Sequence, residues 1–202
     1  GSPLGLEGLV LLKDKSYLIF FISAVLICIP LSFYYSFANV FLNDLGMEGA
    51  AGKMIYGQIS EAIFILAIPF LYYRLGVKNI LIIGIAAWAL RFFFFASGDL
   101  EAYYWMIISG ILLHGICYDF FFVTGYMYTE NKAGEKIKNA AQGLFTVATY
   151  GIGMTIGSWF SGIITDSNTI EGIKNWEEIW MVPAYISGAV LLFLIVFFKE
   201  KK

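Results

Sequence analysis

A glutamine and a glutamate lie inside a stretch that is otherwise apolar enough to cross a membrane. Gln58 and Glu61 are three residues apart within the segment 56–66, so on a helix their side chains emerge from one face. A charged group at bilayer depth is costly, and such residues usually face a cavity or a partner and mark an ion or substrate path. We therefore expect this pair to belong to a site inside the membrane.

A second polar group lies in the segment 114–122. His114 and Tyr118 are four residues apart and share a helix face, whereas Asp119 points about a third of a turn away. An aspartate at this depth has no water unless a cavity supplies it, which favours a functional role. For His114, a hydrogen-bonded structural role and a chemical role both remain open.

Arg91 is a cation inside a third apolar run. The runs that carry Arg91 and Glu61 are consecutive and antiparallel, which places both residues about six positions from their outer helix ends. An ion pair between them would lower the cost of burying either charge. Alternatively, Arg91 snorkels to the outer headgroups, where Asp99 and Glu101 lie. The residues favour neither outcome.

Composition identifies the kind of protein that must position these groups. Of the 202 residues, 59% are hydrophobic and 14% are charged, whereas soluble domains are about 45–50% apolar and about 25% charged. A helix needs about 20 mostly apolar residues to cross the hydrocarbon layer, and no segment alternates as a barrel strand would. Six runs are long enough: 17–42, 55–73, 77–95, 103–128, 140–164 and 179–198. We predict an all-α, polytopic membrane protein with six transmembrane helices over residues 9–202, preceded by a tag or linker remnant at 1–8.

Charge in the links between the runs predicts the orientation. Lys and Arg concentrate on the cytoplasmic side of a membrane protein, and the net charge of −2 argues against a nucleic-acid partner. One side carries Lys13, Lys15, Arg74, Lys78, Lys132, Lys136, Lys138, Lys199, Lys201 and Lys202. The other side carries only Lys53 and Lys174 among eight acidic residues, namely Asp44, Glu48, Asp99, Glu101, Asp166, Glu171, Glu177 and Glu178. Both termini are therefore predicted to be cytoplasmic.

Three further features concern helix shape and packing. Pro30 lies near the middle of the first run and is followed by polar and aromatic residues; proline kinks a helix, and broken helices often line transport cavities. Gly153 and Gly157 are four residues apart in the fifth run, which favours close helix packing. Cys28 and Cys117 lie in apolar runs without a second ligand at metal spacing, so we expect buried thiols.

The ordered motifs of the chain resemble a known family. They are Gln58-Ile59-Ser60-Glu61, Gly76-Val77-Lys78-Asn79, Ala87-Trp88-Ala89-Leu90-Arg91-Phe92, Tyr118-Asp119-Phe120-Phe121 and Ala141-Gln142-Gly143. Together they resemble the second half of bacterial nucleoside:proton symporters of the major facilitator superfamily. The resemblance implies helices seven to twelve of a twelve-helix transporter in the bacterial cytoplasmic membrane, with the substrate site between two six-helix halves. It also implies that the amino-terminal half is missing and that this chain alone does not transport.

The resemblance also implies a set of site residues. It places Gln58, Glu61, Tyr118 and Asp119 at the nucleoside site, where amide and carboxylate groups hydrogen-bond ribose hydroxyls and base edges. Tyr118 or Phe122 would stack on the base. We expect a polar groove on this chain, covered by the missing half, a dimer mate, lipid or detergent, with the residues Ser32, Gln58, Glu61, His114 and Asp119 on its surface.

Three positions depart from the family pattern. The family tends to have a glutamine and an asparagine where this chain has Ser32 and Tyr35, and a tyrosine where it has His114. We count all three among the substrate-binding positions, and their identities bear on base selectivity and on whether the substrate is a nucleoside at all.

The mechanism that the resemblance implies is proton-coupled symport by alternating access. Protonation of a buried acid from outside favours substrate binding, and opening to the cytoplasm rehydrates the site and releases both. Asp119 or Glu61 would carry the proton, with Asp119 favoured because no cation is obvious beside it. No cofactor is expected; the proton is the coupling ion.

Three alternatives compete with this interpretation. The first is a symporter of the same superfamily for sugars or other polyols. The second is an intramembrane hydrolase. Membrane aspartyl proteases pair Tyr-Asp with Gly-x-Gly-Asp, but here Gly151-Ile152-Gly153 is followed by Met154. The sequence also has no Gly-x-Ser-x-Gly and no His-Glu-x-x-His motif, so we do not expect an enzyme. The third is a self-sufficient six-helix channel or scaffold, which a folded homodimer would favour.

Overall fold

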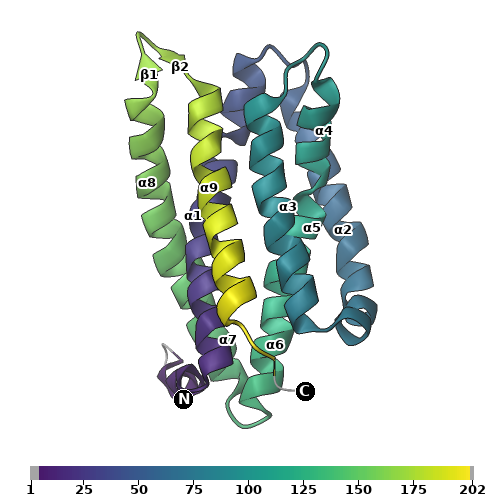
Figure 1. Cartoon of the computed structure of the whole chain (residues 1–202), viewed down its shortest axis with the longest axis vertical. Helices are drawn as coiled ribbons and strands as arrows, with labels where there is room; N and C mark the ends of the chain where they lie inside the picture. Colours follow the sequence, from purple (N-terminus) through teal and green to yellow (C-terminus); the bar gives the residue numbers. More distant parts are fainter. Residues whose placement is uncertain (1–4, 201–202) are drawn as a thin grey trace.

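All six apolar runs form long helices in a computed structural model, which describes residues 5–200 (Figure 1). Each of the first three spans is one uninterrupted helix: α1 (Lys15–Asp44), α2 (Ala50–Leu75) and α3 (Val77–Ser97). The fourth span, Tyr104–Ala133, is divided into α4 (Tyr104–Leu112), α5 (His114–Tyr118), the π-helical η2 (Asp119–Val123) and α6 (Thr124–Ala133). The fifth, Lys138–Ser167, comprises α7 (Lys138–Thr146), the π-helical η3 (Val147–Gly153) and α8 (Met154–Ser167), and the sixth is α9 (Trp176–Phe197). The predicted six-helix, all-α fold is confirmed.

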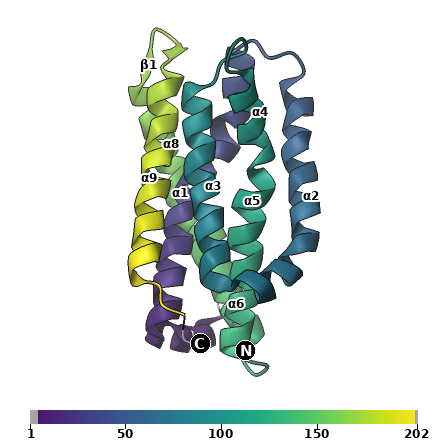
Figure 2. The ribbon, with the colours of Figure 1, turned by 45° about the vertical axis from the view of Figure 1, so that its right-hand side comes forward.

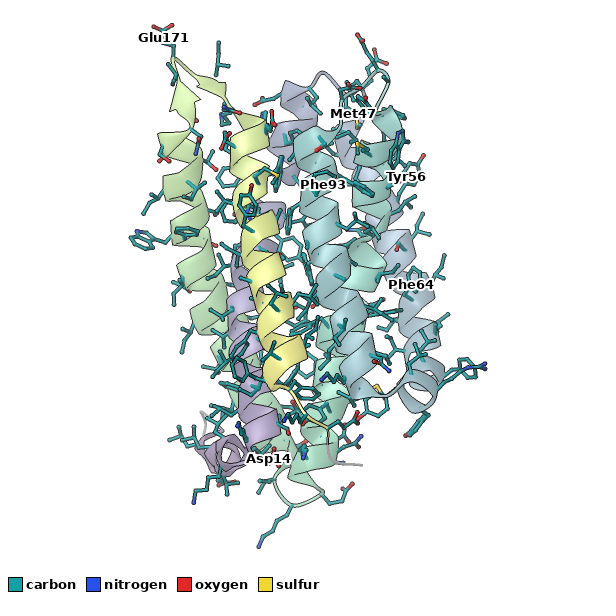
Figure 3. The ribbon with its side chains drawn as sticks, viewed as in Figure 1. Asp14, Met47, Tyr56, Phe64, Phe93 and Glu171 are labelled. Carbon is teal, nitrogen blue, oxygen red and sulfur yellow. The ribbon has the colours of Figure 1, made fainter. Side chains whose placement is uncertain are left out.

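The two ends of the bundle differ in character. The short 3₁₀ helix η1 (Leu6–Lys13) and the end of α9 lie together at one end, and the hairpin β1 (Thr169–Ile170) and β2 (Ile173–Lys174) lies at the other (Figures 1 and 2). Figure 3 labels Asp14 at the first end and Glu171 at the second. Six spans therefore return the chain to the side on which it began, as the charge pattern requires.

The segment predicted as a tag lies only partly inside the described residues. Residues 1–4, like Lys201 and Lys202, fall outside them. η1 packs on α7, and Gly8 approaches so closely that a Cβ there would lie 2.8 Å from the Cα of Ala141. Asp14 then caps α1 by accepting the N–H of Tyr17 at 3.0 Å, and Lys132 lies 3.1 Å from the same carboxylate.

The core is built from large aromatic residues of α1, α3 and α9. Trp180 of α9 stacks on Phe92 of α3, with ring centroids 5.6 Å apart, and meets Phe41 of α1 edge-on at 5.5 Å. All three side chains are buried. Offset and edge-to-face aromatic pairs contribute stabilising free energy beyond that of the area they bury. The contacts among α1, α3 and α9 therefore form the core against which the other spans pack.

The glycines of the fifth span pack against α1, as predicted. A Cβ on Gly153 would lie 2.9 Å from the Cβ of Cys28, and one on Gly157 would lie 2.9 Å from the Cys28 carbonyl oxygen. Small residues at this spacing let two helix backbones approach closely. Cys28 and Cys117 are both free and buried, which confirms the prediction of plain buried thiols.

α2 and α8 present mostly exposed apolar faces. Only Ala50, Gly57, Ser60 and Ile68 of α2 are buried. In α8 the buried residues are Gly157, Ser161 and Thr165. The two helices lie on opposite sides of the bundle (Figure 1), so the molecule has two lateral apolar surfaces.

Candidate functional site

The fourth span is interrupted beside Glu61. α4 ends at Leu112 and α5 begins at His114, and Ser60 of α2 lies against this break. The Ser60 hydroxyl donates to the carbonyl of Leu112 at 2.5 Å and accepts the N–H of Gly115 at 3.2 Å. Backbone groups at a helix break inside a membrane must find partners within the protein. One hydroxyl of the second span therefore bridges the two helices that flank the break.

Small residues on α2 and α5 make this approach possible. A Cβ on Gly57 would lie 3.0 Å from the Ile111 carbonyl oxygen and 3.2 Å from the His114 Cβ. A Cβ on Gly115 would lie 2.4 Å from the Ser60 hydroxyl oxygen. Gly57 and Ser60 are three residues apart and therefore lie on one face of α2. This face is the one that meets α5, and it places Glu61, the next residue, at the edge of the contact.

Arg91 of α3 supplies further partners for the same break. Its side chain is fully buried. Nε donates to the Gly110 carbonyl at 2.7 Å and Nη2 donates to the Ile111 carbonyl at 3.4 Å. The guanidinium carbon lies 3.7 Å from the centroid of the Tyr34 ring, within cation–π range. Arg91 is thus held inside the bundle, and the snorkelling alternative is wrong.

His114 stands between Arg91 and Glu61. Nη1 of Arg91 lies 3.1 Å from Nδ1 of His114, and Nε2 of His114 lies 3.4 Å from Oε2 of Glu61. The possible direct ion pair between Arg91 and Glu61 is therefore not formed. The two residues do converge from antiparallel helices, but the imidazole from the fourth span fills the space between them.

The side of this cluster that faces away from the core is open. Glu61 retains 35% of its side-chain exposure, Tyr35 of α1 is 52% exposed, and Gln58 is exposed without a hydrogen-bond partner among the described residues. The Tyr35 ring meets the His114 ring edge-on at 6.3 Å. A carboxylate, an amide and a phenol are thus available to a polar solute at this face.

Asp119 lies one helical turn farther along, at the first position of η2. It is fully buried, and neither of its carboxylate oxygens has a hydrogen-bond partner in the described part of the chain. Segments of π-helix occur frequently at functional sites. A buried carboxylate without a partner is costly when charged. Asp119 therefore does not stabilise the fold, which favours a functional role for it.

Aromatic rings connect Asp119's neighbours to the fifth span. The Tyr118 hydroxyl contacts the hydroxyl of Tyr150 in η3. The Tyr118 ring lies 5.1 Å from Phe122 and 5.8 Å from His114. Phe122 itself is fully buried. Of the two predicted stacking residues, therefore, only Tyr118 keeps an accessible part.

The predicted polar groove is only partly correct. Gln58 and Glu61 do face outward, but Ser32, His114 and Asp119 are buried. Ser32 is covered by α8: its hydroxyl donates to the Cys28 carbonyl at 2.8 Å and lies 3.3 Å from the Met154 carbonyl. Tyr35, three residues later and offset by about 60° around the helix axis, lies beside His114 instead.

A cleft of about 550 Å³ lies between α2 and α4 and is distinct from the polar cluster. Tyr56 and Phe64, which Figure 3 labels along α2, lie on its wall with Ser60. No charged residue is among its lining residues. The cleft is therefore apolar, and we do not assign the polar chemistry to it.

Sequence reasoning missed three participants. Ser60 closes the break in the fourth span, Tyr34 lies under the Arg91 guanidinium, and Tyr150 meets Tyr118. Ser60 directly precedes Glu61. Its three-residue spacing from Gly57 places two small residues on one helix face, and this pattern could have predicted a close helix contact there. Nothing local marks Tyr34 or Tyr150, because their contacts come from other spans.

Six apolar spans, of which the fourth is broken and carries inward-facing polar residues, define a polytopic membrane protein. The structure resembles a crystal structure of the nucleoside transporter NupG, with a TM-score of 0.87 and 33% identity, over 98% of this chain and 52% of that one. This match confirms the predicted half of a major facilitator fold.

Sequence comparison identifies the family. The chain belongs to the nucleoside H⁺ symporter family, whose model matches residues 2–202. It is similar to the putative nucleoside transporter YegT of Escherichia coli (strain K12), with 39% identity over 98% of this chain and 48% of the relative. The sucrose permease of Escherichia coli is more distant, at 26% identity over 97% of this chain and 46% of the relative. The chain thus spans about half the length of the relatives it matches.

Proposed function

We propose that this chain is half of a proton-coupled nucleoside symporter that works by alternating access. The observation that carries the proposal is the open cluster of Gln58, Glu61 and Tyr35 beside Asp119, which is buried and has no hydrogen-bond partner among residues 5–200. Membership of the nucleoside H⁺ symporter family supports the substrate class. A second six-helix half, packed on the exposed faces of this one, completes the site.

Each open side chain has a role in this proposal. Glu61 accepts hydrogen bonds from ribose hydroxyls, and Gln58 both donates to and accepts from a base edge. Tyr118 and Tyr35 offer aromatic surface for the base. Ser32 is fully buried against α8 and takes no part in substrate contact in our proposal; Phe122 supports Tyr118 from behind.

Asp119 carries the proton in this mechanism. A carboxylate with no partner in apolar surroundings favours its neutral form, whereas access to water when the site opens to the cytoplasm favours release of the proton. Glu61 is the second candidate for the proton carrier. However, the Glu61 carboxylate is partly exposed and lies beside His114, and both features stabilise its charged form. In this proposal Asp119 therefore carries the proton, and Glu61 binds the substrate.

The test of proton coupling uses the transporter that contains this chain. Asp119→Asn is expected to abolish uphill accumulation of labelled uridine while exchange of internal for external uridine continues, because exchange needs no net proton movement. Asp166→Asn, an exposed aspartate at the end of α8, is the matched control. Unchanged accumulation in Asp119→Asn would remove Asp119 from the role and direct the test to Glu61→Gln.

Charge supports the orientation in this proposal, and the relatives support the choice of membrane. The end of the bundle that holds η1 and α6 carries most of the Lys and Arg residues, and by the positive-inside rule we place it in the cytoplasm. The bacterial relatives support a location in the cytoplasmic membrane. The test introduces a cysteine either in the β1–β2 hairpin or at position 136 and treats whole cells with an impermeant thiol reagent. Labelling of the hairpin cysteine alone supports this orientation, and labelling of the cysteine at 136 alone would reverse it.

A sugar is the second candidate substrate, because the sucrose permease of Escherichia coli also matches most of the chain. Uptake of labelled uridine, with unlabelled nucleosides and sugars as competitors and with or without a proton gradient, decides between the two. Competition by nucleosides together with loss of uptake on collapse of the gradient supports the proposal. Sugar transport without uridine uptake would overturn it.

A further inference from the structure

Arg91 is a buried cation whose partners are not carboxylates. Within the described part of the chain it forms no ion pair. Two of its nitrogens donate to carbonyl oxygens, and Nη1 lies 3.1 Å from His114 Nδ1. An arginine stays charged in proteins and carries only hydrogen-bond donors. The nitrogen of His114 that faces it must therefore be the acceptor.

This contact fixes where the proton of His114 resides. A histidine that accepts a hydrogen bond at Nδ1 is neutral and carries its hydrogen on Nε2. Nε2 is the atom that lies 3.4 Å from Oε2 of Glu61. A charged guanidinium on one side of the ring thus directs an N–H toward the carboxylate on the other.

The imidazole is also held in place by aromatic rings. His114 is 4% exposed. Tyr34 stacks on it with centroids 5.1 Å apart and an interplanar angle of 22°, and Tyr118 stacks at 5.8 Å and 27°. Tyr34 also lies under the Arg91 guanidinium. The groups that face His114 from the neighbouring helices are therefore Glu61 of α2, Arg91 of α3, and Tyr34 and Tyr35 of α1.

We propose that Arg91 is a positioning residue for Glu61 and acts through His114. It holds His114 in the neutral form with the proton on Nε2, and that N–H binds one oxygen of the Glu61 carboxylate. The other carboxylate oxygen is left to accept a hydroxyl of the substrate. The assignment of Glu61 to a nucleoside rests on the proposed function, but the state of His114 does not.

The first experiment reads the proton directly. His114 is the one histidine of this chain, and in the ¹⁵N-histidine-labelled transporter its signals are those that His114→Gln removes. We expect an unprotonated Nδ1 and a protonated Nε2. Arg91→Met, which keeps an apolar stem, should abolish this preference, whereas Arg74→Met, a change at the exposed arginine of α2, should preserve it. An imidazolium, or a proton on Nδ1, in the unmodified transporter would overturn the proposal.

The second experiment measures uptake and keeps the proposal testable if Arg91→Met does not fold. Gln can accept from Arg91 and donate to Glu61, whereas Phe can do neither. We expect His114→Phe to raise the KM for uridine about tenfold more than His114→Gln does, with maximal rates compared at equal surface expression. Equal KM values for the two variants would refute a relay through His114. Absence of uridine uptake by the unmodified transporter would instead refute the proposed function and leave the NMR result standing.

Discussion

Removal of the Ser60 hydroxyl should loosen the contact between the second and fourth spans. The hydroxyl makes two hydrogen bonds to the backbone that flanks the break, to the Leu112 carbonyl and from the Gly115 N–H. Interhelical hydrogen bonds in membrane proteins contribute about 0.6 kcal/mol on average and at most about 1.7 kcal/mol. Two such bonds to buried backbone groups predict that Ser60→Ala lowers the free energy of unfolding by about 1–3 kcal/mol.

The melting temperature and the exchange of backbone amides measure this loss. Domains of about 150–250 residues shift by about 2–4 °C per kcal/mol, and the lower figure of about 2 °C suits a larger protein, so we expect Tm to fall by about 2–6 °C. The buried thiols of Cys28 and Cys117 report unfolding to a thiol-reactive dye. Amide exchange of the Gly115 N–H should also accelerate in Ser60→Ala, because it loses its acceptor.

A buried serine elsewhere provides the control. Ser23 is fully buried, but its hydroxyl donates only to the Ile19 carbonyl of its own helix at 2.8 Å. Ser23→Ala therefore leaves no backbone group of another span without a partner. If Ser60→Ala left Tm and exchange unchanged, or if Ser23→Ala lowered Tm equally, the role assigned to the Ser60 hydroxyl would be refuted.

Two further predictions concern helix packing and the end of the bundle that holds η1. Gly157→Ala should destabilise the protein by about 1–3 kcal/mol, because its Cβ would meet the backbone of α1; Gly162→Ala, with open space around it, is the control in a thermal unfolding assay, and equal Tm values would contradict the packing argument. Asp14→Ala should cost about 1 kcal/mol at pH 7, because a helix cap is lost. The Tyr17 N–H and then Lys132 hold the pKa of Asp14 below its usual value despite partial burial, so this stabilisation is present above the ordinary aspartate pKa of about 3.9 and disappears as pH falls below it. A difference between wild type and Asp14→Ala that did not shrink as pH falls from 7 into the acid range would contradict this assignment.

The predictions that succeeded rest on properties that a single span carries by itself. The length of each apolar run, the return of the chain to one side after six spans and the close approach of Gly153 and Gly157 follow from hydropathy, parity and residue size. The resemblance to the symporter family likewise came from ordered local motifs. None of these requires knowledge of how one helix is rotated against another.

The polar contacts depended on helix rotation, which hydropathy does not fix when a helix is apolar on all sides. Ser32 and Tyr35 lie three residues apart on α1, yet one is buried against α8 and the other faces the site. Depth correctly predicted that Arg91 and Glu61 lie near one another, but His114 from another span separates them. The sequence by itself determined which polar residues enter the membrane and at what depth. Only the tertiary structure decided their partners, because those contacts join residues of different spans whose mutual orientation is set by the packing of the whole bundle.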